Sequence, residues 1–173
     1  AAGLGAATCS SFPAPGSCGG HMEWIACSAF GKAGLLGAAI ERFASYINNQ
    51  SDKLKITVYH ANELVPALES LDAVRSGAAQ MAYGAGYYWT NVSNATQFSA
   101  AMPFGLTAQE QNAWCYYGGG IEAADRAYNA IGVKFLPLGN TGNQMGGWYN
   151  KEINSIEDFN GLKIRMPGLG GEV

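Results

Sequence analysis

Arg165 is the residue whose type and position most directly suggest chemistry. It ends an apolar stretch over residues 162–165 that has the pattern of a strand, and Met166, Pro167 and Gly168 follow it. Open α/β sheets bind ligands at the carboxyl ends of their parallel strands, and the planar guanidinium can hold a carboxylate through two parallel hydrogen bonds. The pattern therefore indicates a carboxylate-binding arginine, although a surface arginine at a strand end would look the same.

A glycine-rich loop over residues 139–148 offers neutral polar side chains that could reach a small ligand. It carries Asn140 and Gln144, whose amides donate and accept hydrogen bonds without charge, and it ends at Trp148. Its glycines allow tight turns and a close backbone approach. An ordinary surface loop would have the same composition, so both interpretations stay open.

Two tyrosines form a third candidate group. Tyr87 and Tyr88 follow a short predicted strand over residues 80–83. Aromatic side chains with a polar tip commonly line a pocket at such a place, and they are as often part of a core. The pattern favours neither interpretation.

The familiar arrangements of catalytic and metal-binding residues are missing from this sequence. It contains no GxSxG, HExxH or CxxC motif, no phosphate-binding loop, and no GxGxxG after a strand. The acidic residues fall mostly on predicted helices in solvent-facing patterns. The sequence therefore offers no candidate for catalysis and none for a zinc site.

The composition excludes two classes of partner. Apolar residues make up 48% of the 173 residues and charged residues 13%, about half the usual ~25%. The net charge is −3 and no basic patch is visible, which argues against nucleic-acid binding. No apolar run approaches the ~18–20 residues that cross a bilayer. Of the four cysteines, Cys9 and Cys18 could pair in an oxidising compartment, and free thiols are the simpler expectation.

The apolar spacing predicts the elements that would position these residues. Residues 36–49 have the periodicity of an amphipathic helix, and residues 53–59 alternate like a half-buried strand with Lys53 and Lys55 exposed. A second helix is predicted over residues 64–76, with Gly77 ending it, before the strand at 80–83. This alternation of helices and strands with short links predicts an α/β fold with a parallel sheet.

The pattern continues past residue 100. Thr107 and Glu110 form a capping box for a helix that runs through Tyr117, and a further helix is predicted over residues 121–130. Strands are predicted over residues 133–138, 144–149 and 162–165, with a short helical turn capped by Ser155. At the other end, residues 1–22 are mostly small residues that cannot bury a core. They are predicted to be the tail of an export signal peptide, a linker or a tag remnant.

Several longer blocks occur along the chain in a recognisable order. They are Glu63-Leu64-Val65-Pro66, Asp72-Ala73-Val74, Tyr87-Tyr88-Trp89, Met102-Pro103-Phe104-Gly105-Leu106-Thr107, Gly139-Asn140-Thr141-Gly142-Asn143-Gln144-Met145-Gly146-Gly147-Trp148 and Asp158-Phe159-Asn160-Gly161-Leu162-Lys163-Ile164-Arg165-Met166-Pro167-Gly168. This ordered set closely resembles the solute-binding proteins of tripartite ATP-independent periplasmic (TRAP) transporters, in the branch that binds 2-oxo and 2-hydroxy carboxylates. The resemblance runs from Trp24 to Val173.

The resemblance implies a periplasmic-binding-protein-like fold, in which two α/β lobes with parallel-rich sheets enclose a cleft. Residues 23–138 would form the first lobe and residues 139–173 the start of the second. We therefore expect the chain to correspond to the N-terminal half of such a protein, with the rest of the second lobe beyond Val173.

The resemblance also implies roles for single residues. Arg165 corresponds to the arginine that holds the ligand carboxylate, and Gln144 to a cleft glutamine that contacts both the ligand and a bound cation. The cation would be Na⁺ or Ca²⁺, bridging the ligand to Gln144 and to carboxylates beyond Val173, and no catalytic cofactor is implied. Four further side chains are candidates for the cleft: Tyr88, Asn140, Tyr87 and Trp148.

As a function, the resemblance implies a periplasmic protein, exported by a signal peptide, that is not an enzyme. It would capture a small carboxylate and deliver it to the membrane permease of a TRAP transporter, and it could form a homodimer. Two alternatives stay open. One is the ligand-binding domain of a sensor or receptor, and the other is an α/β enzyme acting on a small carboxylic acid.

Overall fold

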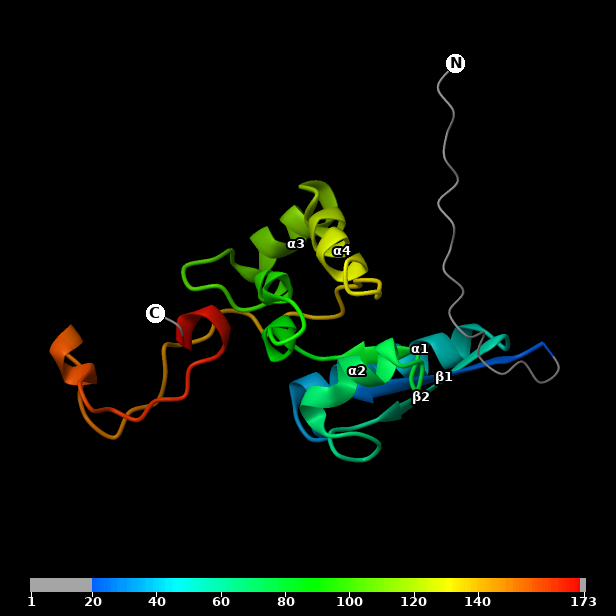
Figure 1. Cartoon of the computed structure of the whole chain (residues 1–173), viewed down its shortest axis with the longest axis horizontal. Coiled ribbons are helices and arrows are strands. Elements are labelled where there is room, and N and C mark those ends of the chain that lie inside the picture. Colours follow the sequence, from blue (N-terminus) through cyan, green and yellow to red (C-terminus); the bar gives the residue numbers. More distant parts are fainter. Residues whose placement is uncertain (1–19, 172–173) are drawn as a thin grey trace, which may run out of the picture.

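The structure, a computed structural model, describes residues 20–171 and is built on a parallel sheet of three strands. The strands are β1 (Met22–Ser28), β2 (Leu54–Tyr59) and β3 (Met81–Tyr83), in the order β2-β1-β3. The central strand β1 runs parallel to both neighbours. Helices α1 (Leu35–Gln50) and α2 (Ser70–Arg75) lie in the connections between successive strands (Figure 1). The predicted α/β fold with a parallel sheet is confirmed.

Most of the elements with strong local signals form where they were predicted. Helix α1 and strands β2 and β3 match the predicted ranges within one residue at each end. Helix α3 (Ala108–Tyr117) begins at the predicted capping box, in which the Thr107 side chain accepts from the backbone N–H of Glu110 and the Glu110 carboxylate accepts from that of Thr107. Helix α4 (Gly120–Asn129) follows it, and a second capping box joins Ser155 to Asp158.

The helix predicted over residues 64–76 is wrong in its first half. Only α2 is α-helical there, preceded by one 3₁₀ turn, η1 (Ala67–Glu69). Pro66 has no backbone N–H and cannot continue a helix from residues before it. Leu64 and Leu68, which defined the predicted apolar face, are 46% and 59% exposed. Gly77 follows α2 with φ +82°, so the predicted helix end is confirmed.

The strands predicted over residues 133–138, 144–149 and 162–165 are also wrong. None of these segments is a strand within the described residues. A strand is stable only when a neighbour pairs with its backbone, and the sheet in this part of the chain has only β1, β2 and β3. In Figure 1 the chain beyond α4 follows a long open path before it ends at the short turn η5 (Gly168–Gly171).

Three clusters of buried side chains hold the elements together. In the first, Ala44 of α1 packs on Ala26 and Ile56 of the sheet. A second, centred on Trp89 and Tyr128, joins α2, α4 and the start of the segment after α4. A third lies around Cys27.

Cys27 and Cys115 are free and buried, as predicted, and Cys9 and Cys18 lie outside the described residues. Burial raises the pKa of the Cys27 thiol, which leaves it in the unreactive protonated form. No helix within residues 20–171 combines the length and the apolar character needed to cross a membrane.

Asn48 protects the outer edge of the sheet and yields a first testable prediction. Its Nδ2 donates to the Ile56 carbonyl at 2.9 Å, and its Oδ1 accepts from the Ile56 N–H at 2.7 Å. We expect Asn48→Ala to lower the free energy of unfolding by about 2–3 kcal/mol, because it removes two hydrogen bonds and leaves both backbone groups of an edge residue unpaired. Denaturant unfolding measures this change.

The neighbouring Asn49 supplies the matched control. It is exposed, and no side-chain hydrogen bond of Asn49 is found within residues 20–171. Asn49→Ala should therefore change the free energy of unfolding by less than about 0.5 kcal/mol. If both substitutions changed the free energy of unfolding equally, the two Asn48–Ile56 hydrogen bonds would not stabilise the sheet.

Candidate functional site

An aromatic cluster forms at the edge of the sheet where the parallel strands end. It consists of Phe30, just after β1, Tyr83 at the end of β3, and Tyr87 and Tyr88 in the 3₁₀ turn η2 (Gly86–Trp89). The ring centroid of Phe30 lies 5.3 Å from that of Tyr83 and 6.0 Å from that of Tyr88, and those of Tyr87 and Tyr88 are 4.9 Å apart. All four side chains are half-buried. Their packed rings form an apolar surface that also carries the three tyrosine hydroxyl groups. This surface lies at the carboxyl edge of the sheet, where parallel sheets bind ligands.

Arg165 approaches this cluster from the other end of the chain. Burial is the main cause that raises the pKa of the Tyr88 phenol and Tyr87 raises it further, whereas the positive charge of Arg165 acts in the opposite direction. Gly168, three residues further along the chain, packs closely on Tyr87, so Arg165 lies in the neighbourhood of the aromatic cluster. Arg165 itself is exposed. Arg165 does not end a strand, so that prediction is wrong. It lies just before the turn η5, and this turn packs on Tyr87 near the carboxyl edge of the sheet.

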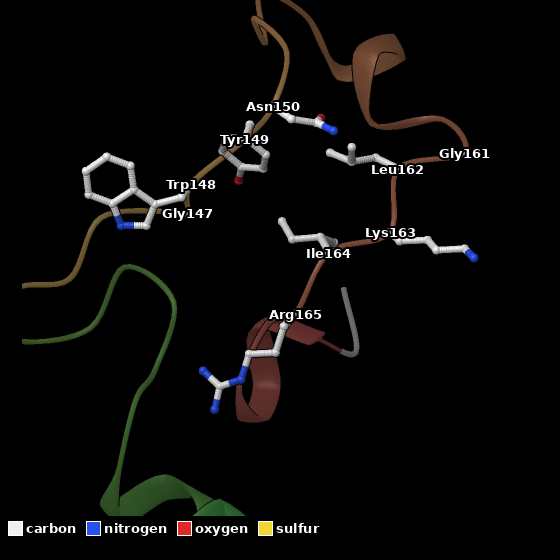
Figure 2. Close-up of a pocket in the computed structure, with 9 residues that line it drawn as sticks. All are labelled: Gly147, Trp148, Tyr149, Asn150, Gly161, Leu162, Lys163, Ile164 and Arg165. Carbon is white, nitrogen blue, oxygen red and sulfur yellow. The ribbon is translucent and has the colours of Figure 1, made fainter. Parts of the chain in front are cut away.

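An open hollow lies beside Arg165, between two extended segments. Residues 147–150 line one side and residues 161–165 the other, and Figure 2 shows Trp148 and Tyr149 on the first segment and Ile164 and Arg165 on the second. The hollow has a volume of about 640 Å³, which is within the range of ligand pockets. Trp148, however, is 97% exposed. The hollow therefore places Trp148 and Arg165 on one surface and does not enclose a ligand.

Asn140 and Gln144 make only local hydrogen bonds in the described structure. The Asn140 side-chain oxygen accepts from the Gly142 N–H at 2.7 Å, and Gln144 Nε2 donates to the Thr141 hydroxyl at 3.0 Å. Both side chains are exposed. The structure thus brings Tyr87 and Tyr88 together, and it places Arg165 and Trp148 around one hollow. No described contact joins Asn140 or Gln144 to them.

The donor set for a cation is incomplete in this part of the chain. Within residues 20–171 there is no group of three or more His, Cys, Asp or Glu side chains that could hold a metal ion. Gln144 could serve such a site as a single neutral oxygen ligand, since its Nε2 donates to Thr141 and no hydrogen bond of its Oε1 is found within residues 20–171. Na⁺ and Ca²⁺ take about six oxygens or more, so Gln144 could contribute to a cation site but could not form one.

Sequence reasoning missed Phe30 and Tyr83 as members of the site. Both sit at strand ends, and β1 itself was not predicted because a central parallel strand is buried on both faces and shows no alternation. The short apolar run Trp24–Cys27 was the one available signal. Gly168, which packs against Tyr87, was noticed only as part of a turn.

Comparison with known proteins places the chain in a family. Residues 30–173 match the family model described as "Bacterial extracellular solute-binding protein, family 7", also called DctP. The chain belongs to this family. The resemblance drawn from the sequence is thereby confirmed.

Several similar proteins are named for, or were solved with, a bound ligand. A protein of Nostoc sp. (strain PCC 7120) named "Monocarboxylate 2-oxoacid-binding periplasmic protein" is 49% identical over 121 residues, which cover 70% of this chain and 33% of the relative. A TRAP periplasmic solute-binding protein from Pseudoalteromonas atlantica T6c, solved with sodium and pyruvate, is 43% identical with a TM-score of 0.83. One from Colwellia psychrerythraea, solved with calcium and pyruvate, is 42% identical with a TM-score of 0.84.

The chain spans about half the length of these solved relatives. Each structural match covers 88% of this chain and 47% of the solved protein. The family membership of this DctP chain is therefore established over residues 30–173, and the ligand and partners of the whole protein are matters for proposal.

Proposed function

We propose that this DctP chain forms part of a solute-binding protein that captures a small 2-oxo or 2-hydroxy monocarboxylate outside the cytoplasm and passes it to a TRAP permease. The observation that carries the proposal is the place of Arg165, which lines the hollow beside residues 147–150 and precedes Gly168, the residue that packs on Tyr87 of the aromatic cluster. The pyruvate bound by two solved relatives at more than 40% identity supports the choice of ligand class.

The proposed mechanism is binding without reaction. The guanidinium of Arg165 pairs with the ligand carboxylate through two parallel hydrogen bonds. The Tyr88 phenol stays protonated at neutral pH, since burial raises its pKa, and can donate to the same carboxylate. The rings of the aromatic cluster remove water from one side of the pair, which strengthens it. Trp148, Asn140 and Gln144 would join the ligand when the lobes close around it.

A bound Na⁺ or Ca²⁺ belongs to this proposal. Arg165 satisfies the carboxylate, so the 2-oxo or 2-hydroxy oxygen next to it needs another partner, and a hard cation is a suitable one. Gln144 supplies one neutral oxygen ligand toward that cation. The remaining ligands come from residues other than those described, because the described residues contain no acidic cluster for it.

The location and partners follow from the family. A family 7 solute-binding protein acts outside the cytoplasm, and residues 1–22 are proposed to be the end of the signal that exports it. The partner that receives the ligand is the membrane permease of the transporter, and a homodimer is a further proposed assembly.

Calorimetry on the protein encoded by the complete reading frame tests the function. Pyruvate and propionate have similar size and charge, and propionate lacks the 2-oxo oxygen. We expect pyruvate to bind at least about tenfold more tightly, because a site built to hold that oxygen leaves its partner unsatisfied with propionate. Nuclear magnetic resonance of the incubated solution should show unchanged pyruvate. Turnover of pyruvate would favour an enzyme, and no binding of any 2-oxo or 2-hydroxy acid would overturn the proposal.

A further inference from the structure

The turn η5 brings the end of the described chain back onto the aromatic cluster. At Gly168 the chain packs so closely on Tyr87 that a Cβ added to the glycine would lie 3.1 Å from the Tyr87 Cβ and 3.3 Å from the Cγ and Cδ1 atoms of its ring. Gly168 also has φ +56°, a left-handed backbone that residues with side chains rarely adopt. Two independent features therefore favour a glycine at this position.

Tyr87 has little freedom to move away from such a side chain. Its neighbour Gly86 is buried against η3 (Asn94–Ser99), where a Cβ at Gly86 would lie 2.1 Å from the Thr96 carbonyl oxygen and 2.5 Å from Ser99 Oγ. The backbone of η2 is thus already in close contact on its other side. We therefore expect a larger residue at position 168 to shift η5, which has no buried residue, rather than η2, in which Gly86 and Trp89 are buried.

The link from Gly168 to Arg165 is short and stiff. Only Met166 and Pro167 lie between them, and the ring of Pro167 restricts its own φ and the backbone of the residue before it. We therefore expect a displacement of η5 to move Arg165 relative to the aromatic cluster.

We infer that Gly168 is a positioning residue for Arg165, because its contact with Tyr87 holds the guanidinium at the aromatic cluster. The part of this inference that concerns ligand affinity rests on the proposed function, in which Arg165 binds the ligand carboxylate. Gly168 itself has no side chain that could touch a ligand.

Gly168→Ala tests the inference in the protein encoded by the complete reading frame. We expect its affinity for pyruvate to fall by roughly three- to tenfold, because the contact with Tyr87 shifts the turn by a few tenths of an ångström and the left-handed φ adds strain. The matched control is Gly132→Ala, since Gly132 also has a left-handed φ, +85°, but a Cβ there meets nothing within 4 Å. The control should keep the wild-type affinity within about twofold. Equal losses in both variants would overturn the inference.

A double-mutant cycle shows whether Gly168 acts through Arg165. In an Arg165→Ala background, Gly168→Ala should have almost no further effect on affinity, because the group that it positions is already gone. Two effects that simply add would overturn the inference. Gly168→Asn separates backbone strain from the contact, because asparagine tolerates a left-handed φ but still carries a Cβ. It should also lose affinity, and wild-type affinity in this variant would overturn the assigned contact.

A second readout needs no ligand and stands even if the proposed function fails. In protein labelled with ¹³C at the tyrosine ring carbons, the Tyr88 signal is assigned by its loss in Tyr88→Phe. Gly168→Ala should raise the pKa of the Tyr88 phenol, since it moves the positive charge of Arg165 away, and Gly132→Ala should not. An unchanged Tyr88 titration in Gly168→Ala would overturn the inference whether or not pyruvate binds to the wild type.

Discussion

Replacing Arg165 by alanine is expected to lower the affinity for pyruvate by about thirty- to a thousandfold. The loss corresponds to about 2–4 kcal/mol for a bidentate pair between the guanidinium and a carboxylate that the aromatic cluster shields from water. The Tyr88 phenol would remain, but a neutral donor cannot replace the charge. Titration calorimetry on the protein encoded by the complete reading frame measures the change.

Two further variants sharpen this result. Arg165→Lys keeps the charge but loses the planar fork, so its affinity should lie between those of the wild type and the alanine variant. Arg126→Ala removes an exposed arginine from α4, away from the proposed site, and should leave binding unchanged. If pyruvate bound equally well to Arg165→Ala and to the wild type, the ligand would lie elsewhere, and Arg165 would be an ordinary surface arginine.

Removal of cations is expected to have the second large effect. Exhaustive chelation in Na⁺-free buffer should weaken pyruvate binding by about a hundredfold or more, equivalent to ~2.7 kcal/mol. The reason is that the 2-oxo oxygen then loses the cation that coordinates it, and Arg165 alone cannot bind both the carboxylate and the 2-oxo oxygen. Restoring Na⁺ or Ca²⁺ separately should show which ion rescues the affinity.

Substitution of Gln144 links this cation effect to the described chain. Gln144→Ala should weaken both the ion and pyruvate, whereas Gln109→Ala, at an exposed position of α3, should weaken neither. Pyruvate that binds equally well with excess chelator and no Na⁺ would refute the cation bridge. The site would then consist of Arg165 and neutral polar side chains.

The sequence alone predicted those elements whose signal involves residues only a few positions apart along the chain. Helix α1 follows from its apolar period, β2 from its alternation, the starts of α3 and of the turn after Ser155 from their capping boxes, and the end of α2 from Gly77. Each signal concerns neighbours along the chain, so no distant partner is needed to interpret it. The ordered motifs also identified the family, which the comparison with known proteins confirmed.

The tertiary structure alone decided which apolar stretches become strands. Residues 133–138, 144–149 and 162–165 have strand-like sequences but no partner strand among the described residues, while β1 lacks alternation and becomes the centre of the sheet. Pairing depends on segments far apart in sequence, and no local pattern encodes it.

The candidate site divides in the same way. Arg165, Tyr87, Tyr88 and Trp148 were identifiable as residue types suited to a carboxylate ligand, and the sequence could not show which of them meet. Only the fold brings η5 against η2, which places Arg165 in the neighbourhood of the aromatic cluster. Only the fold adds Phe30 and Tyr83 from the ends of β1 and β3. The physical reason is that a parallel sheet collects strand ends from distant parts of the chain at one edge, whereas sequence spacing records only neighbours.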